Sequence, residues 1–177
     1  NGFLLSKGMA RKLVSTGFSN INISIDGNSN KTVNLIRGRE YAYKTTQQGV
    51  RYLLQEIKKQ HFHTKVIIKT IIMGLNINEL PDLVCKMVKT GVHGIYFQPI
   101  EPIYNSKQTF LELKKSKLWI QQKDKIQALK VINQLISMKK AGSPIINEVS
   151  NLEALKKYFE LENNTSIKPT KHCIIDL

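Results

Sequence analysis

Hydrophobic and polar positions alternate along the chain with two different periods. Apolar residues recur at helical spacing in four segments, which predicts helices over about residues 6–16, 45–60, 77–90 and 124–141. Period-two alternation and β-branched runs predict three strands between them, over residues 20–26, 65–72 and 93–98. Helices that separate strands imply right-handed crossovers. We therefore expect an α/β fold whose helices cover one side of a curved parallel sheet.

Local signals refine these elements. Ser6 is a predicted N-cap, and Gly17 stands where a glycine would end the same helix. Asn76 and Glu79 have the spacing of a capping box at the start of the third helix. The run from Val66 to Ile72 is β-branched, which is typical of a strand covered on both faces.

Two stretches carry no clear periodicity and are predicted to be irregular. The first is a polar loop after the first strand, which contains Arg37 before Gly38. The second spans residues 101–119. After Pro144, a short extended piece, a further helix around residues 152–159 and a polar linker over 162–171 complete the chain.

Polar residues follow the predicted first strand toward its carboxyl end, which is where parallel α/β folds place their sites. Alternation puts Asn22, Ser24 and Asp26 on one face. A hydroxyl beside a carboxylate suits a ribose diol or an ammonium group. With equal weight, Asp26 caps the turn at Gly27 and Ser24 bonds only to backbone.

Two further positions are candidates for the same edge. Tyr96 and Gln98 share one face of the third strand, although spacing alone favours a packed tyrosine and a glutamine at a loop mouth. An arginine in a polar loop is commonly solvated. Arg37, followed by glycine, also suits closure over a ligand carboxylate.

Charge suggests one competing class of function. The formal net charge is +14, which suits a basic α/β module that binds polyanions such as nucleic acid. Only four of the 27 basic residues are arginine, and the lysines are spread over every predicted helix. Because phosphate recognition favours arginine, this spread favours a solvated lysine surface instead.

Cysteines, apolar runs and chain ends set the remaining limits. Cys85 and Cys173 lie far apart in sequence, which predicts no disulfide framework and favours a reducing cytoplasm. No apolar stretch is long enough to span a bilayer, and the first residues do not resemble a signal peptide. The start at Asn1 without methionine and the strand-like end are interpreted as cut ends.

Several short motifs occur along the chain in a fixed order: Asn1–Leu5 (NGFLL), Ser24–Gly27 (SIDG), Ile36–Gly38 (IRG), Leu75–Leu80 (LNINEL), Gly91–Pro99 (GVHGIYFQP), Lys139–Asn147 (KKAGSPIIN), Tyr158–Phe159 and Cys173. Together they resemble the radical S-adenosylmethionine (SAM) enzymes that carry a SPASM-like C-terminal extension. Each motif is weak alone. Their shared order and spacing over nearly the whole chain are fairly specific.

The resemblance implies a fold and a chemistry. Residues 1–142 would form part of a (β/α) barrel, and residues 143–177 would begin the C-terminal extension. A 4Fe–4S cluster would cleave SAM to a 5′-deoxyadenosyl radical, which abstracts hydrogen from a peptide, a cofactor precursor or another small molecule. An electron donor such as flavodoxin or ferredoxin would be the redox partner.

The resemblance also assigns roles to single residues. Ser24 and Asp26 would contact the ribose or amino group of SAM, Arg37 would bind its carboxylate, and Gln98 would line the pocket floor. Cys173 would be the first ligand of an auxiliary iron–sulfur cluster, since thiolates suit such clusters.

The sequence departs from the family pattern in two respects. The C-x-x-x-C-x-x-C loop and a G-G-E segment would lie upstream of Asn1, so the chain alone is expected to be inactive. Val33 and Asn34 replace the usual His-Asp before I-R-G, which leaves the role of that pair in doubt.

Overall fold

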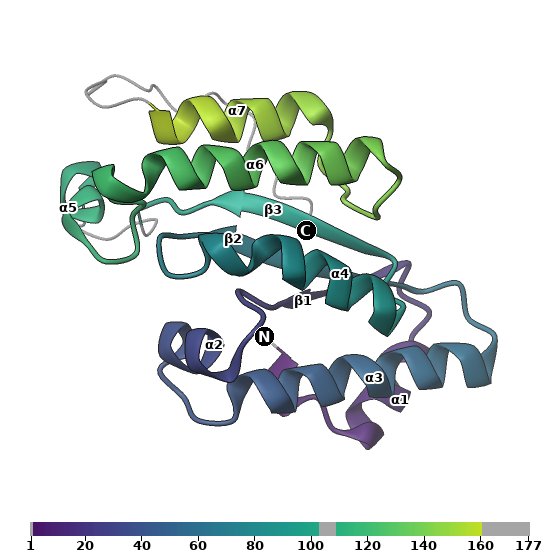
Figure 1. Ribbon diagram of the computed structural model, residues 1–177. Coiled ribbons are helices and arrows are strands. Elements are labelled where there is room, and N and C mark those ends of the chain that lie inside the picture. The colour runs from purple at the N-terminus through teal and green to yellow at the C-terminus, as the bar shows by residue number, and fades with distance from the viewer. Residues whose placement is uncertain (1, 103–108, 161–177) are drawn as a thin grey trace.

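The computed structural model describes residues 2–102 and 109–160 (Figure 1). Within these residues three strands alternate with helices. The strands are β1 (Asn20–Ser24), β2 (Lys65–Ile72) and β3 (Gly94–Pro99). The α-helices are α1 (Lys7–Ser15), α2 (Asn30–Arg37), α3 (Ala42–Gln60), α4 (Leu80–Thr90), α5 (Phe110–Lys115), α6 (Lys125–Lys140) and α7 (Val149–Glu160). Short 3-10 helices cover Gly2–Leu4, Ile77–Glu79 and Gln122–Asp124.

The strands form one parallel sheet in the order β1-β2-β3. Helices α2 and α3 connect β1 to β2, and α4 connects β2 to β3. The register aligns Ile23 with Ile68, and Ile68 with Ile95. Both pairings are parallel, which confirms the predicted α/β fold class.

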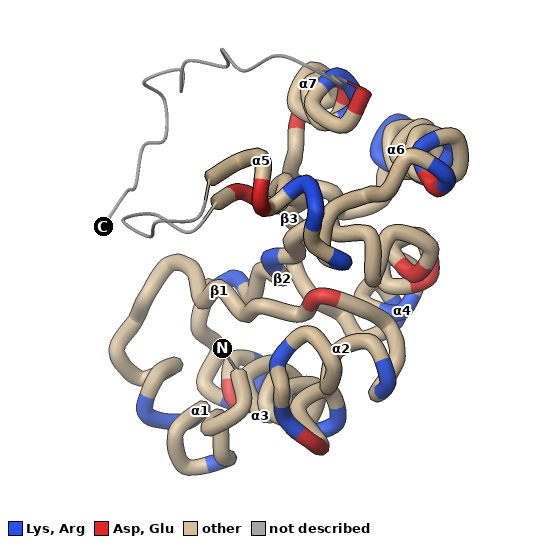
Figure 2. Tube along the Cα trace, turned by 90° about the vertical axis from the view of Figure 1, so that its left-hand side faces the viewer, with Lys and Arg blue, Asp and Glu red and all other residues tan. Residues whose placement is uncertain are grey.

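Helices cover one face of this sheet. Figure 2 shows α3, α4 and α6 along one side of the curved strands. The side chains of Ile23, Ile68 and Ile95 point to that side and are buried. On the opposite face Ile71 is 39% exposed, and the side chains that alternate with the buried ones are partly or fully open. The prediction that β2 is covered on both faces is therefore wrong for the described residues; we call the uncovered side the open face.

A short segment after α6 pairs with the outer edge of β3 and so widens the sheet. Ile145 pairs with Ile95 in a parallel bridge, in which the Ile95 amide donates to the Pro144 carbonyl (2.8 Å) and the Ile146 amide donates to the Ile95 carbonyl (2.8 Å). Slightly further along, the Asn147 side chain accepts from the Phe97 amide (2.7 Å) and donates to the Phe97 carbonyl (2.9 Å). Helix α7 then packs beside α6 (Figure 1).

Helix ends follow the sequence signals at the two ends of α1. The Ser6 hydroxyl accepts from the Met9 amide (3.2 Å), as an N-cap does. Gly17 has φ +73°, a backbone conformation that residues with a Cβ rarely adopt. Both predictions for this helix are confirmed.

Two helices lie where irregular structure was predicted. The predicted loop around Arg37 is largely the eight-residue helix α2, which begins after the N-cap Ser29 and ends before Gly38 at φ +59°. Within the stretch 101–119, α5 begins at a capping box between Thr109 and Glu112. Both helices are short, so their apolar positions are too few to show a helical period.

The outer surface bears on the charge and membrane expectations. Figure 2 shows Lys and Arg positions spread over several helices. In the described part of the chain no helix is both long and apolar enough to cross a membrane.

Cys173 and the predicted linker over 162–171 lie outside the described residues. The expected boundary between a partial barrel domain (residues 1–142) and a C-terminal extension (residues 143–177) stays a prediction.

Candidate functional site

The open face carries one polar row that crosses all three strands. The register places Ser24 of β1 beside Lys69 of β2, and Lys69 beside Tyr96 of β3. All three side chains are partly exposed. One step toward the carboxyl edge, Ile71 lies beside Gln98. Two predicted site residues, Ser24 and Gln98, therefore share the open face near the carboxyl ends of the strands.

Two other predicted site residues, Asp26 and Arg37, form an ion pair with each other. The Arg37 guanidinium donates to Asp26 Oδ2, and the Ile71 amide donates to Asp26 Oδ1 (3.0 Å). The Asp26 side chain is 3% exposed and that of Arg37 is 31% exposed. Both carboxylate oxygens are thus engaged within the chain, while the Arg37 side chain stays partly exposed.

Burial and partners act in opposite directions on the Asp26 carboxyl. Its burial raises the pKa above the usual value of an aspartic acid, because desolvation penalises the charged form. The Ile71 amide and the Arg37 charge oppose this rise. Arg37 therefore compensates a carboxylate that the fold has removed from water.

Asn76 joins the ends of β1 and β2 beneath this ion pair. Its side-chain amide donates to the carbonyls of Asp26 and Ile71 (2.7 Å each), and its oxygen accepts from the Met73 amide (2.8 Å). The residue is fully buried. A capping box at this position was predicted and is wrong, because the side chain of Asn76 makes no helix-cap bond.

Glu79 reaches across to the turn between β1 and α2 instead of closing that capping box. Its carboxylate accepts from the Asn28 amide (2.6 Å), the Ser29 amide (3.1 Å), the Ser29 hydroxyl (2.9 Å) and the Thr32 hydroxyl. A carboxylate at the N-terminus of α2 also interacts favourably with the helix dipole. Glu79 thereby fixes the start of the helix whose last residue is Arg37.

A second chain of hydrogen bonds supports the same turn. The Tyr43 hydroxyl donates to the Asn28 side-chain oxygen (2.9 Å) and accepts from the Lys86 ammonium (2.8 Å). Burial, and next the charge of Glu79, raise the pKa of Tyr43 to about 12. The phenol therefore stays protonated and keeps its donor role at neutral pH.

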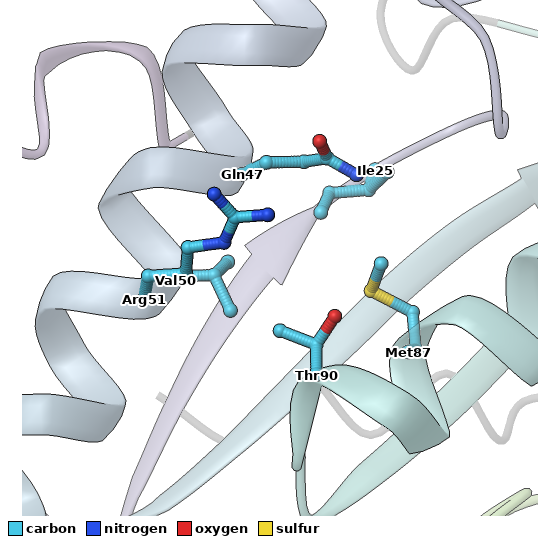
Figure 3. A pocket seen from close by; sticks show the side chains of 6 residues that line it. All are labelled: Ile25, Gln47, Val50, Arg51, Met87 and Thr90. Carbon is cyan, nitrogen blue, oxygen red and sulfur yellow. The ribbon is translucent and has the colours of Figure 1, made fainter.

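Two hollows among the described residues border α3. Figure 3 shows a crevice between α3, α4 and the end of β1, where Gln47, Arg51, Met87 and Thr90 surround a space of about 10 Å³. That volume accommodates about one water molecule. A wider hollow of about 500 Å³ lies between the N-terminal segment and α3. Neither contains Ser24, Asp26, Arg37 or Gln98.

The described residues do not provide a metal centre. Within ranges 2–102 and 109–160, no three His, Cys, Asp or Glu side chains come together in a way that would hold an ion. Cys85, the described cysteine, is exposed on α4. A 4Fe–4S cluster therefore has no ligand set among the residues that the structure describes.

Sequence reasoning missed three residues that build this site. Lys69 carries a signal, because a lysine that interrupts an apolar strand must reach water or a ligand. Asn76 and Glu79 stand out in the sequence, but their spacing matches a local cap and gives no sign of partners about 50 residues away.

Comparisons with known proteins identify a related sequence and solved structures with a similar fold. No protein-family model matches it. It is 37% identical over 107 residues to the GTP 3',8-cyclase of Trichodesmium erythraeum (strain IMS101), a match that covers 60% of this chain and 31% of the relative. The matched region thus spans about a third of that relative's length.

Solved structures share the fold. Native anSMEcpe with bound AdoMet and the Kp18Cys peptide superposes with a TM-score of 0.54 at 16% identity, covering 82% of this chain and 38% of that one. Native anSMEcpe with bound AdoMet gives the same TM-score of 0.54, with the same identity and coverage. At this identity the likeness concerns the fold alone.

Proposed function

From the relation to radical SAM enzymes that these comparisons support, we propose that the chain is part of such an enzyme and binds SAM at the carboxyl edge of its sheet. The single observation that carries the proposal is the shared position of Ser24 and Gln98 on the open face, with the Asp26–Arg37 pair at the same edge. SAM offers a ribose diol, an amino group and a carboxylate, and this donor set suits all three.

The two residues of the Asp26–Arg37 ion pair have different roles in this proposal. The Asp26 side chain is 3% exposed and both of its oxygens are bonded within the chain, so Asp26 acts by orienting Arg37 rather than by touching SAM. The Arg37 side chain is partly exposed and donates to Asp26 through Nη2, so its other N–H groups would bind the SAM carboxylate. Ser24 and Gln98 then bind the ribose or the amino group.

The remaining chemistry is assigned to sequence outside the described residues. SAM supplies, when cleaved, a 5′-deoxyadenosyl radical that abstracts hydrogen from a substrate. A 4Fe–4S cluster would cleave SAM, and Cys173 would be a ligand of an auxiliary cluster. A flavodoxin or ferredoxin would deliver the electron in the cytoplasm. The solved neighbour with a bound peptide and the cyclase named for GTP leave peptides and small molecules as substrate classes.

The test measures SAM binding in the complete protein with its cluster reconstituted. Ser24→Ala and Gln98→Ala are each expected to weaken SAM binding tenfold or more, about 1.4 kcal/mol, because each loses a polar contact with the ligand. Asn22→Ala is the matched control, since Asn22 lies on the same strand and face but further from the edge. Unchanged affinity in both Ser24→Ala and Gln98→Ala removes the site from this edge.

A further inference from the structure

Lys69 and Tyr96 are hydrogen-bond donors that stand side by side on the open face. The register pairs them directly on neighbouring strands, which lie about 4.8 Å apart in parallel sheets. Among the described residues neither side chain has a hydrogen bond or ion pair. The ammonium and the phenol hydroxyl therefore both have donor capacity available at one point of this face.

Two carboxylates close to the carboxyl ends of the strands, those of Asp26 and Glu79, are engaged by other groups. Asp26 is paired with Arg37, and the Glu79 carboxylate is held by the turn before α2. Along its own strand and face, Lys69 has Ile67 and Ile71 as neighbours. A cation between two isoleucines in the middle strand gives this face a positive point that suits an anion.

The row also has a defined relation to the proposed SAM site. Ser24, at one end of the row, and Gln98, one step closer to the edge, are assigned to SAM. Lys69 lies beside Ser24 on the neighbouring strand, and Tyr96 lies two residues before Gln98 on the same face of β3. A molecule that contacts them would lie against bound SAM.

We propose that Lys69 and Tyr96 bind an anionic group, a carboxylate or a phosphate, of the substrate. The ammonium supplies the charge, and the phenol hydroxyl donates a second hydrogen bond to the same oxyanion. This inference rests on the proposed function, because it takes the neighbouring edge to be the SAM site. It narrows the substrate class to acidic molecules.

The test titrates inorganic pyrophosphate and succinate into the complete, cluster-reconstituted protein, with and without saturating SAM. Lys69→Met and Tyr96→Phe are each expected to weaken binding of the preferred anion at least fivefold, and Lys69→Arg should retain most of it. Lys65→Met is the matched control, because Lys65 shares the strand and the face but lies at the opposite edge. Tighter binding of pyrophosphate assigns a phosphate, and tighter binding of succinate assigns a carboxylate.

Three results overturn the inference: no binding of either anion to the parent protein, equal binding to Lys69→Met, or equal loss in Lys65→Met. SAM affinity is measured in the same variants. A tenfold loss of SAM affinity in Lys69→Met shows that Lys69 serves SAM itself and also overturns the assignment. Anion binding that depends on Lys69 in a protein that does not bind SAM supports the anion site and rejects the proposed function.

Discussion

Arg37, the last residue of α2, donates to the buried carboxylate of Asp26, which lies just beyond the end of β1. The pair fixes α2 against the carboxyl edge of the sheet. Removing the guanidinium leaves a desolvated carboxylate whose remaining partner is the Ile71 amide. We expect Arg37→Met to lower the free energy of unfolding by about 2 kcal/mol at pH 7, below the range for fully buried pairs because Arg37 is partly exposed.

The same variant should show a dependence on pH. Without Arg37 the pKa of Asp26 rises further, so the folded chain holds the proton more tightly than the unfolded chain does. The destabilisation is then smallest at low pH and grows as the pH rises through the folded-state pKa of Asp26. Urea unfolding of Arg37→Met and of the exposed α2 control Lys31→Met, between pH 4 and 8, measures it. A constant difference from the parent protein across this range contradicts the prediction.

Glu79 is expected to control the mobility of the turn before α2. Glu79→Ala removes the acceptor of the Asn28 and Ser29 amides and of two hydroxyls. Hydrogen exchange of these two amides should accelerate at least tenfold, equivalent to about 1.4 kcal/mol of local stability. Asp82→Asn is the control, because Asp82 is exposed in the first turn of the next helix. Exchange that stays slow in Glu79→Ala shows that the turn is held by other contacts.

Tyr43 should make the fold sensitive to alkali. Its pKa is about 12 when folded and near 10 when unfolded, so the folded chain holds the proton more tightly. Stability therefore falls as the pH rises from 10 to 12. Tyr43→Phe loses hydrogen bonds at pH 8 and is less stable there, but its deficit should shrink between pH 10 and 12. Tyr41→Phe, at a residue 67% exposed, serves as the control in chemical unfolding at each pH.

Two buried threonines should respond in opposite directions to the same change. Thr64 Oγ1 is buried and has no hydrogen-bond partner among the residues described, whereas the Thr70 hydroxyl donates to the Ile25 carbonyl (2.7 Å). Thr64→Val should raise the free energy of unfolding by about 0.5–1 kcal/mol, and Thr70→Val should lower it by about 1 kcal/mol. Urea unfolding of both variants tests the pair; a loss of stability in Thr64→Val contradicts the assignment of an unsatisfied hydroxyl.

The sequence predicts the parallel sheet well because alternation on β1 and the buried face of α4 are local patterns. It also brings Ser24 and Gln98 to one face, since period two fixes which side each strand residue takes. Asp26 and Arg37 were expected at the same edge, but their ion pair was not predicted, because it depends on α2, whose eight residues carry too few apolar positions to reveal a helix.

Long-range polar contacts were likewise beyond local reasoning. Asn76 and Glu79 have the spacing of a cap, and only the folded chain shows that they bind β1 and the turn after it. Helix-end signals succeed where the partner is three residues away, as at Ser6. Helix-end signals fail at Asn76 and Glu79, because these side chains bond to groups about 50 residues away instead of to the local helix end.

The side chain of Asn147 occupies backbone groups at the outer edge of β3. Its amide occupies both the N–H and the carbonyl of Phe97, as a neighbouring peptide unit would. The backbone groups of Phe97 are therefore not available for strand pairing with another chain. In the described residues β1 has no strand on its outer side, so its backbone edge is open to pairing with an additional strand.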